Sequence, residues 1–197
     1  MRLILASGSK QRKDIFNMIG INYEVITSNE EEITNETDPR KYVVELSKIK
    51  ANSVKKQIDG NAIIVACDTI INLGDKIIEK PKTKEQAINI MNEIQGNKTI
   101  AITGVTILDL YQNKEVNFKD ETIVEFEEMT EEEITWYVEN EKTIHNVCGY
   151  ALLGKACLFL KGVEGDYNTL FGISPSKVYK ELKKLGYTLK DFEFKDN

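Results

Sequence analysis

Hydrophobic and polar positions follow two rhythms along the first third of the chain, one typical of strands and one typical of helices. Residues 2–6 form a short apolar run, and the small polar residues Ser7-Gly8-Ser9 separate it from an amphipathic stretch. Residues 21–27 alternate as a half-buried strand does. After Asp38-Pro39, which favours a helix start, apolar residues recur at helical spacing over 39–58. This part predicts strand, helix, strand and a long helix.

The middle of the chain is rich in β-branched residues. Residues 62–67 are a continuous apolar run, which predicts a strand buried on both faces with Asp68 at its carboxyl end. The apolar residues that follow turn at Gly74-Asp75, as in a β-hairpin. Thr83 and the glutamine three residues later have the spacing of a capping box, which predicts a helix. Two long strands are then predicted, over 98–109 and 114–127.

The last third predicts four further elements. They are a helix from Thr130 to about Glu141, a strand over 149–160, a glycine-rich turn at Gly162–Gly165 and a helix from Ser174-Pro175 to Leu185. Because strands and helices interleave but include hairpins, we expect an α/β fold with a mixed sheet flanked by helices. The chain lacks a linker rich in Pro, Gly or Ser, so we expect one domain over residues 1–190 and a polar tail over 191–197.

Charge and composition argue against several classes of function. A net charge of −6 argues against non-specific binding to nucleic acid, which draws on a surplus of Lys and Arg. The apolar run at the N-terminus is too short for a signal peptide or a membrane span, so we expect a cytoplasmic protein without a membrane partner. Three widely spaced cysteines and one histidine offer little for a zinc site. A metal would therefore be held by oxygen ligands.

The loop from Ser7 to Arg12 lies between a predicted strand and a predicted helix. Unpaired backbone N–H groups at a helix start favour an anion, so the loop, including Ser9, is a candidate phosphate site. Small polar residues at a helix start are also commonly caps, and that alternative stays open. The loop lacks the spacing of a Walker motif.

Charged residues elsewhere are candidates for catalysis. At the carboxyl end of a buried strand, Asp68 is placed to orient or deprotonate water or to bind a metal, although a turn or capping role is the alternative. Lys50 on the long helix and Lys80 before a proline are candidates for contacts with phosphate, although most such lysines are simply solvated. Glu31 lies in an acidic run and is a candidate ligand for Mg²⁺ or a solvent-facing residue.

Six segments in order resemble motifs of the Maf family of nucleotide pyrophosphatases, also known as septum formation inhibitor-like proteins. The family's L-A-S-x-S-P-R-R is similar to the segment that begins at Leu5, and its L-A-x-x-K-A to that from Leu46. The others, D-T-x-V, G-K-P, T-G-V and G-D-Y-x-N-V-V-G-L-P, resemble segments that begin at Asp68, Glu79, Thr103 and Gly165. The resemblance runs from Leu3 to about Leu185.

The resemblance implies an elongated mixed β-sheet flanked by helices, the architecture shared with inosine triphosphate pyrophosphatases. It implies hydrolysis of a nucleoside triphosphate to the monophosphate and pyrophosphate, with Mg²⁺, Mn²⁺ or Co²⁺ as the cofactor. On this basis Asp68 activates water, and Glu31 helps Asp68 to hold the metal. The residues that the resemblance places at the phosphates are Ser7, Ser9, Arg12, Lys50 and Lys80. It leaves a homodimer open.

Several departures from the family pattern bear on substrate choice. Gln11 replaces the first arginine of the R-R pair, and Asn146 and Leu153 replace a lysine and a glutamine of a later motif. Asp68-Thr69 resembles the branch that acts on dTTP and UTP, which we favour, whereas His145 looks more like the branch that acts on 7-methyl-GTP. A nucleotide-binding regulator of cell division with little turnover is a further alternative.

Overall fold

The computed structural model describes residues 1–141 and 154–195. The chain divides into two compact units that interleave along the sequence. The first unit contains residues 1–68, 103–120 and 171–197, and the second contains residues 69–102 and 121–170. The expectation of a single domain stays a prediction.

Within the described residues, seven strands form one mixed sheet in the order β2-β1-β3-β5-β6-β7, with β4 paired to β3. β1 pairs in parallel with β2 and β3, whereas β4 and β7 pair antiparallel to their neighbours. The mixed α/β fold predicted from the sequence is confirmed. The strands are β1 (Leu3–Leu5), β2 (Glu24–Val25), β3 (Ile63–Leu73), β4 (Lys76–Ile78), β5 (Lys98–Asp109), β6 (Lys114–Phe126) and β7 (Leu160–Gly165).

Five α-helices are described, and each lies where the hydrophobic period predicted one. They are α1 (Lys10–Met18), α2 (Pro39–Lys56), α3 (Lys84–Ile94), α4 (Glu131–Asn140) and α5 (Pro175–Lys184). Their caps follow the sequence signals, since the side chains of Asp38, Thr83 and Thr130 each accept a hydrogen bond from a backbone N–H of the first turn. The full capping box is present at Thr130 and Glu133.

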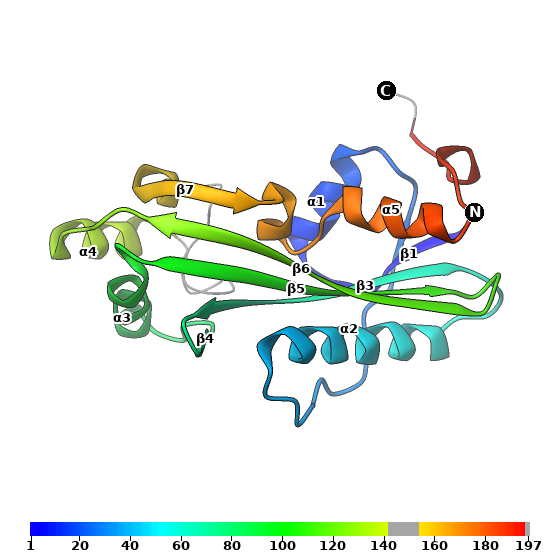
Figure 1. The fold of residues 1–197 in the computed structure, drawn as a ribbon, viewed down its shortest axis with the longest axis horizontal. Helices are drawn as coiled ribbons and strands as arrows, with labels where there is room; N and C mark the ends of the chain where they lie inside the picture. The colour runs from blue at the N-terminus through cyan, green and yellow to red at the C-terminus, as the bar shows by residue number, and fades with distance from the viewer. Residues whose placement is uncertain (142–153, 196–197) are drawn as a thin grey trace. The chain divides into compact units, whose positions relative to one another are not determined.

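In the first unit, α2 covers one face of the sheet, and α1 and α5 cover the other (Figure 1). Alternate strand residues contribute to the two faces, as the pleat of a strand requires. Leu3, Leu5 and Val65 belong to the core under α1 and α5, whereas Ile4 and Ile64 belong to the core under α2. Both cores exclude water from the strands that carry the candidate residues.

The second unit has a core of its own. Strand residues such as Ile71, Ala101 and Phe126 pack against Met91 of α3 and Tyr137 of α4. The two helices contact each other. All members of this core lie within the stretches 69–102 and 121–170.

Three expectations about strands are wrong. Asp68 lies inside β3 rather than at the end of a strand, because β3 continues through Asp68-Thr69 to Leu73. Residues 155–159, predicted as strand, form a 3₁₀ helix (Lys155–Phe159), and residues 149–153 lie outside the described residues. Gly162–Gly165 is not a turn, since these residues belong to β7 and pair with β6.

Two other predicted segments differ from the structure, namely the strand over 21–27 and the polar tail over 191–197. The strand predicted over 21–27 is short, because only Glu24–Val25 pairs with β1. The C-terminal segment reaches the first core through Phe192, which is buried. The backbone N–H of Lys195 also donates to the carbonyl of Gly20 at 2.7 Å, so the segment is tied to the end of α1.

Candidate active site

Helix α2 is fixed closely against the sheet of the first unit. Gly104 of β5 has no side chain, and a Cβ atom there would overlap the backbone of Val43 and Val44. The buried hydroxyl of Ser47 also lies 2.7 Å from that of Thr106 on β5. The T-G-V motif is therefore a contact surface for α2, because only glycine allows the helix to approach so closely.

Lys50 of α2 lies between two carboxylates. Its Nζ atom is 2.5 Å from Oδ1 of Asp68 and 3.0 Å from Oε2 of Glu32. The side chains of Lys50 and Asp68 are only 13% and 14% exposed, so water screens this pair weakly. The contact places the predicted base, Asp68, beside one predicted phosphate ligand, Lys50.

Asp68 is on the α2 face of the sheet. It shares that face with Ile64, since even-numbered residues of β3 point toward α2. β1 pairs with β3 only up to Val65, so Asp68 lies three residues beyond the last paired position. The strand continues, yet the carboxylate still stands past the carboxyl end of β1, where parallel sheets present ligand-binding groups.

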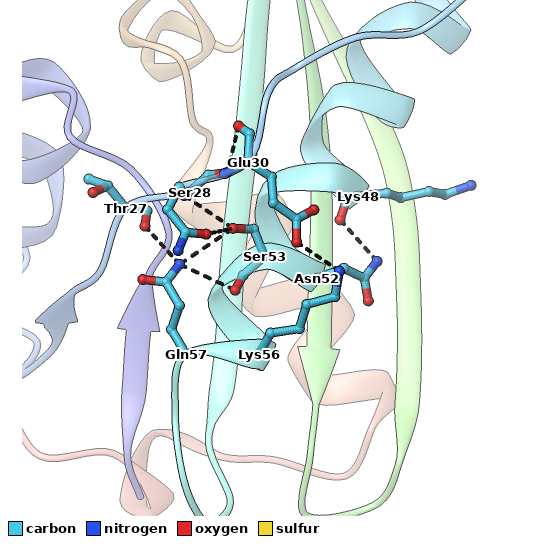
Figure 2. A network of polar contacts seen from close by, with 9 residues as sticks. Thr27, Ser28, Glu30, Lys48, Asn52, Ser53, Lys56 and Gln57 are labelled. Carbon is cyan, nitrogen blue, oxygen red and sulfur yellow. Dashed lines mark hydrogen bonds and ion pairs between the residues drawn. The ribbon is translucent and has the colours of Figure 1, made fainter.

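The segment before Glu32 is bound along α2 by the polar network in Figure 2. Gln57 donates from Nε2 to the carbonyl of Thr27 at 3.1 Å, and Lys56 pairs with Glu30 at 2.7 Å. Ser53 is fully buried and exchanges two hydrogen bonds with Asn29. These contacts hold the acidic segment beside the helix that carries Lys50.

Arg12 of α1 is held from two directions. Its Nε atom donates to the carbonyl of Gly172 at 2.8 Å, and its Nη1 atom donates to the hydroxyl of Ser7 at 3.0 Å. Arg12 and Ser7 are both buried. Gly172 adopts a φ of 87°, a conformation that favours glycine and that aims its carbonyl at the guanidinium. The last motif of the resemblance thus orients the arginine of the first.

The thiol of Cys67 interacts electrostatically with both Arg12 and Lys50. Burial raises the pKa of its thiol to about 11, and the nearby cations Arg12 and Lys50 partly oppose that rise. Cys67 belongs to the core under α1 and α5, and the next residue, Asp68, points to the opposite face. Cations therefore approach this point of β3 from both faces of the sheet.

The other predicted residues are placed differently. The hydroxyl of Ser9 donates to Oε1 of Gln11 at 3.1 Å and does not cap α1. Glu31 is exposed, and it is the next residue, Glu32, that contacts Lys50. Thr69 and the exposed Lys80 belong to the second unit. The roles proposed for Ser9, Glu31, Thr69 and Lys80 stay predictions.

Glu32 is the residue that the sequence analysis missed. Three consecutive glutamates, Glu30 to Glu32, offer the same chemistry, and local sequence does not distinguish them. The contacts of the segment with α2 select Glu32, and no local signal in the sequence indicated it. Asn146, Leu153 and His145 lie outside the described residues.

The cluster fits a hard divalent cation. Asp68 and Glu32 present oxygen ligands to one point, which the ammonium group of Lys50 contacts. Mg²⁺ is usually bound through one or two carboxylates together with waters and substrate phosphates. Among residues 1–141 and 154–195, no group of three or more His, Cys, Asp or Glu side chains is arranged to hold a metal. Two carboxylates match the number that usually holds Mg²⁺ where waters and phosphates supply the other ligands.

The model of the family described as "Maf-like protein" matches residues 2–185. A dTTP/UTP pyrophosphatase of Lachnoclostridium phytofermentans is 37% identical, over 95% of this chain and 97% of the relative. One of Thermoanaerobacter sp. is 35% identical, over 93% and 96%. The solved structure of a HAM1 protein from Coxiella burnetii is similar in fold, with a TM-score of 0.50 at 13% identity, over 94% of this chain and 98% of that chain. No described helix combines the length and the hydropathy that a membrane span requires.

Proposed function

Because the chain belongs to the Maf-like protein family, we propose that it hydrolyses a nucleoside triphosphate, dTTP or UTP by preference, to the monophosphate and pyrophosphate. Its relatives support the substrate class, since proteins that are 35–37% identical over nearly the whole chain carry the name dTTP/UTP pyrophosphatase. The pair Asp68-Thr69 resembles the branch of the family that acts on dTTP and UTP, and this supports the proposed nucleobase preference.

The contact of Lys50 with both Asp68 and Glu32 carries this proposal. Hydrolysis of a phosphoanhydride needs a group that accepts a proton from water and cations that neutralise the charge on the phosphate oxygens. Asp68 supplies the first, and Lys50 supplies one of the second. Their low exposure strengthens both effects, since charges interact more strongly where water is excluded.

In the proposed reaction, the carboxylate of Asp68 orients a water molecule and accepts its proton. The water oxygen forms a bond to the α-phosphorus, and the bond between that phosphorus and the oxygen bridging to the β-phosphorus breaks. Pyrophosphate then leaves with the electron pair of that bond. Lys50 moves from the carboxylates to the phosphate oxygens, and the buried Arg12 adds positive charge behind the loop of Ser7.

A divalent metal is part of the proposal. Asp68 and Glu32 are the residues that would hold it, and Glu31 stays a candidate as the neighbouring carboxylate. When bound, such an ion neutralises charge on the phosphates and withdraws electrons from the phosphorus. Lys80 would contribute a further contact to the phosphates, as the G-K-P resemblance implies.

We also propose that the enzyme works in the cytoplasm, where its substrates are made, and that its net charge of −6 keeps it from nucleic acid. The resemblance further implies a role linked to septum formation, and it leaves a homodimer open. Sedimentation of the purified protein tests the last point.

A panel of triphosphates tests the function. Purified protein is incubated with dTTP, UTP, 7-methyl-GTP and the common nucleotides in the presence of Mg²⁺, Mn²⁺ or Co²⁺, and released pyrophosphate is measured. We expect release from dTTP and UTP above all others, and none after chelation of the metal. Preference for 7-methyl-GTP would refute the proposed preference for the thymine and uracil nucleotides. Tight nucleotide binding without any release of pyrophosphate would favour the alternative of a nucleotide-binding regulator.

A further inference from the structure

Three contacts of the acidic segment with α2 and its C-cap follow an antiparallel order, which the exposed ion pair of Glu30 with Lys56 does not share. Thr27 meets Gln57, Asn29 meets Ser53, and Glu32 meets Lys50. Figure 2 shows the first part of this arrangement, with Ser53 on α2 and Gln57 at its C-cap. The order of these pairs defines a register between the segment and the helix.

A change in that register would bring a different side chain to Lys50. A slip of one position would bring Glu31 to the place of Glu32, and a slip of two would bring Glu30. All three are glutamates, so side-chain chemistry alone does not select among them.

The contact between Ser53 and Asn29 is best suited to fix the register. The Oγ atom of Ser53 accepts a hydrogen bond from the backbone N–H of Asn29 at 3.2 Å and donates one to Oδ1 of the same residue at 2.9 Å. Because one bond involves the backbone of Asn29, it locates the segment itself. Ser53 is fully buried, so water does not readily replace either bond.

The neighbouring ion pair is a weaker constraint. Lys56 and Glu30 are 68% and 40% exposed, and exposed pairs contribute little to stability. The long side chain of lysine also reaches several positions, so it does not distinguish one register from the next. The reciprocal bonds of Ser53 with Asn29 are short-range and directional.

We propose that Ser53 and Asn29 are positioning residues for the divalent metal, because their reciprocal hydrogen bonds set the register that brings Glu32, rather than Glu30 or Glu31, beside Asp68. This inference rests on the proposed function, since it assumes that Asp68 and Glu32 hold the metal. Neither Ser53 nor Asn29 is proposed as a ligand of the metal.

Binding of Mn²⁺ alone, followed by electron paramagnetic resonance of the free ion, tests the inference without turnover. We expect Ser53→Ala to raise the dissociation constant for Mn²⁺ by about tenfold, at the lower end of the range for partners that orient metal ligands. The matched control is Asn52→Ala. Asn52 is the preceding residue of α2, and its amide donates to Lys48 of the same helix at 3.0 Å. It should leave Mn²⁺ binding unchanged.

Two further measurements separate positioning from general damage. With dTTP as substrate, Ser53→Ala should raise the Mn²⁺ concentration needed for half-maximal turnover, while turnover at saturating Mn²⁺ stays close to wild type. In a double-mutant cycle, Asn29→Ala should add little to the loss caused by Ser53→Ala, because the two residues act as one pair. Asn29→Asp keeps the oxygen that accepts the hydrogen bond from Ser53, so its affinity for Mn²⁺ should be closer to wild type than that of Asn29→Ala.

The glutamates themselves give the sharpest comparison. In the wild-type background, Glu32→Gln should weaken Mn²⁺ binding far more than Glu30→Gln or Glu31→Gln, and in the Ser53→Ala background this difference should shrink. Unchanged Mn²⁺ affinity in a folded Ser53→Ala protein would overturn the inference and leave the proposed function intact. A wild-type protein that binds no Mn²⁺, with or without dTTP, would instead count against the metal site.

Discussion

The ammonium group of Lys50 touches Asp68 and Glu32 at once, and this single contact accounts for much of the chemistry proposed here. A lysine between two carboxylates offsets their repulsion while the phosphate is absent. In the proposed reaction, phosphate oxygens compete with the carboxylates for the same cation, which leaves Asp68 free to accept a proton from water.

Replacing Asp68 with asparagine tests its role as the base. Asp68→Asn keeps the shape of the side chain but removes the proton acceptor, so turnover should fall by at least about a hundredfold. Nucleotide binding, followed by calorimetry, should remain. Near-wild-type release of pyrophosphate by this variant would remove Asp68 from the role.

Cys67 makes stability depend on pH in the alkaline range. The ordinary pKa of a thiol here is 9.0, and burial raises that of Cys67 to about 11. Between these values the unfolded chain has lost the proton that the folded chain retains, so the free energy of unfolding falls as the pH rises.

Chemical denaturation of wild type and Cys67→Ala from pH 8 to pH 11 checks this dependence. Cys67→Ala is expected to be less stable at pH 8, because it leaves a cavity, but to lose less stability on the way to pH 11. Parallel curves for the two proteins would contradict the assignment.

At the scale of elements, α2 is the helix on which the site depends. It carries Lys50, it binds the acidic segment through Ser53, and it is seated on β5 at Gly104. The three functions lie on one helix, so a displacement of α2 would disturb all of them together.

The close contact between Gly104 of β5 and helix α2 can be tested directly. Gly104→Ala places a methyl group into the backbone of Val43 and Val44, and we expect a loss of about 1–3 kcal/mol in the free energy of unfolding, as for other overpacked sites. Urea denaturation gives the value. Gly162→Ala in β7 is the matched control, because a Cβ atom there has no neighbour within 4 Å. An equal loss in both variants would indicate that strand glycine, not the helix contact, is responsible.

The whole molecule consists of two units with separate cores, yet neither unit is a continuous piece of chain. β3, β5 and β6 each begin in one unit and end in the other. Because the same three strands run through both units, the loss of one unit should destabilise the other.

We therefore expect one cooperative unfolding transition, which would support the single domain predicted from the sequence. Trp136, the only tryptophan, lies in α4 and reports on the second unit by fluorescence, and alkylation of Cys67 reports on the first. Both probes should change at the same guanidinium concentration. Two separate midpoints would show that the units unfold independently.

The hydrophobic period was sufficient to predict most of the elements. The five α-helices among the described residues, the hairpin at Gly74 and the long pair β5 and β6 follow from local patterns and caps, since a helix or a tight turn is specified by residues close in the chain. The prediction failed at Asp68-Thr69, where polar residues appeared to end a strand. Pairing with distant strands carries β3 through that point, and a local pattern does not report such pairing.

For the candidate site too, the sequence determined some features and the tertiary structure decided others. The sequence by itself determined which types of residue are available, namely Asp68, Lys50 and Arg12 in motifs at recognisable positions, because those identities are local. Only the tertiary structure decided that Glu32 rather than Glu31 meets Lys50, and that Gly172 holds Arg12 from 160 residues away. These contacts depend on register and on the packing of α2, which arise from interactions between segments far apart in the chain.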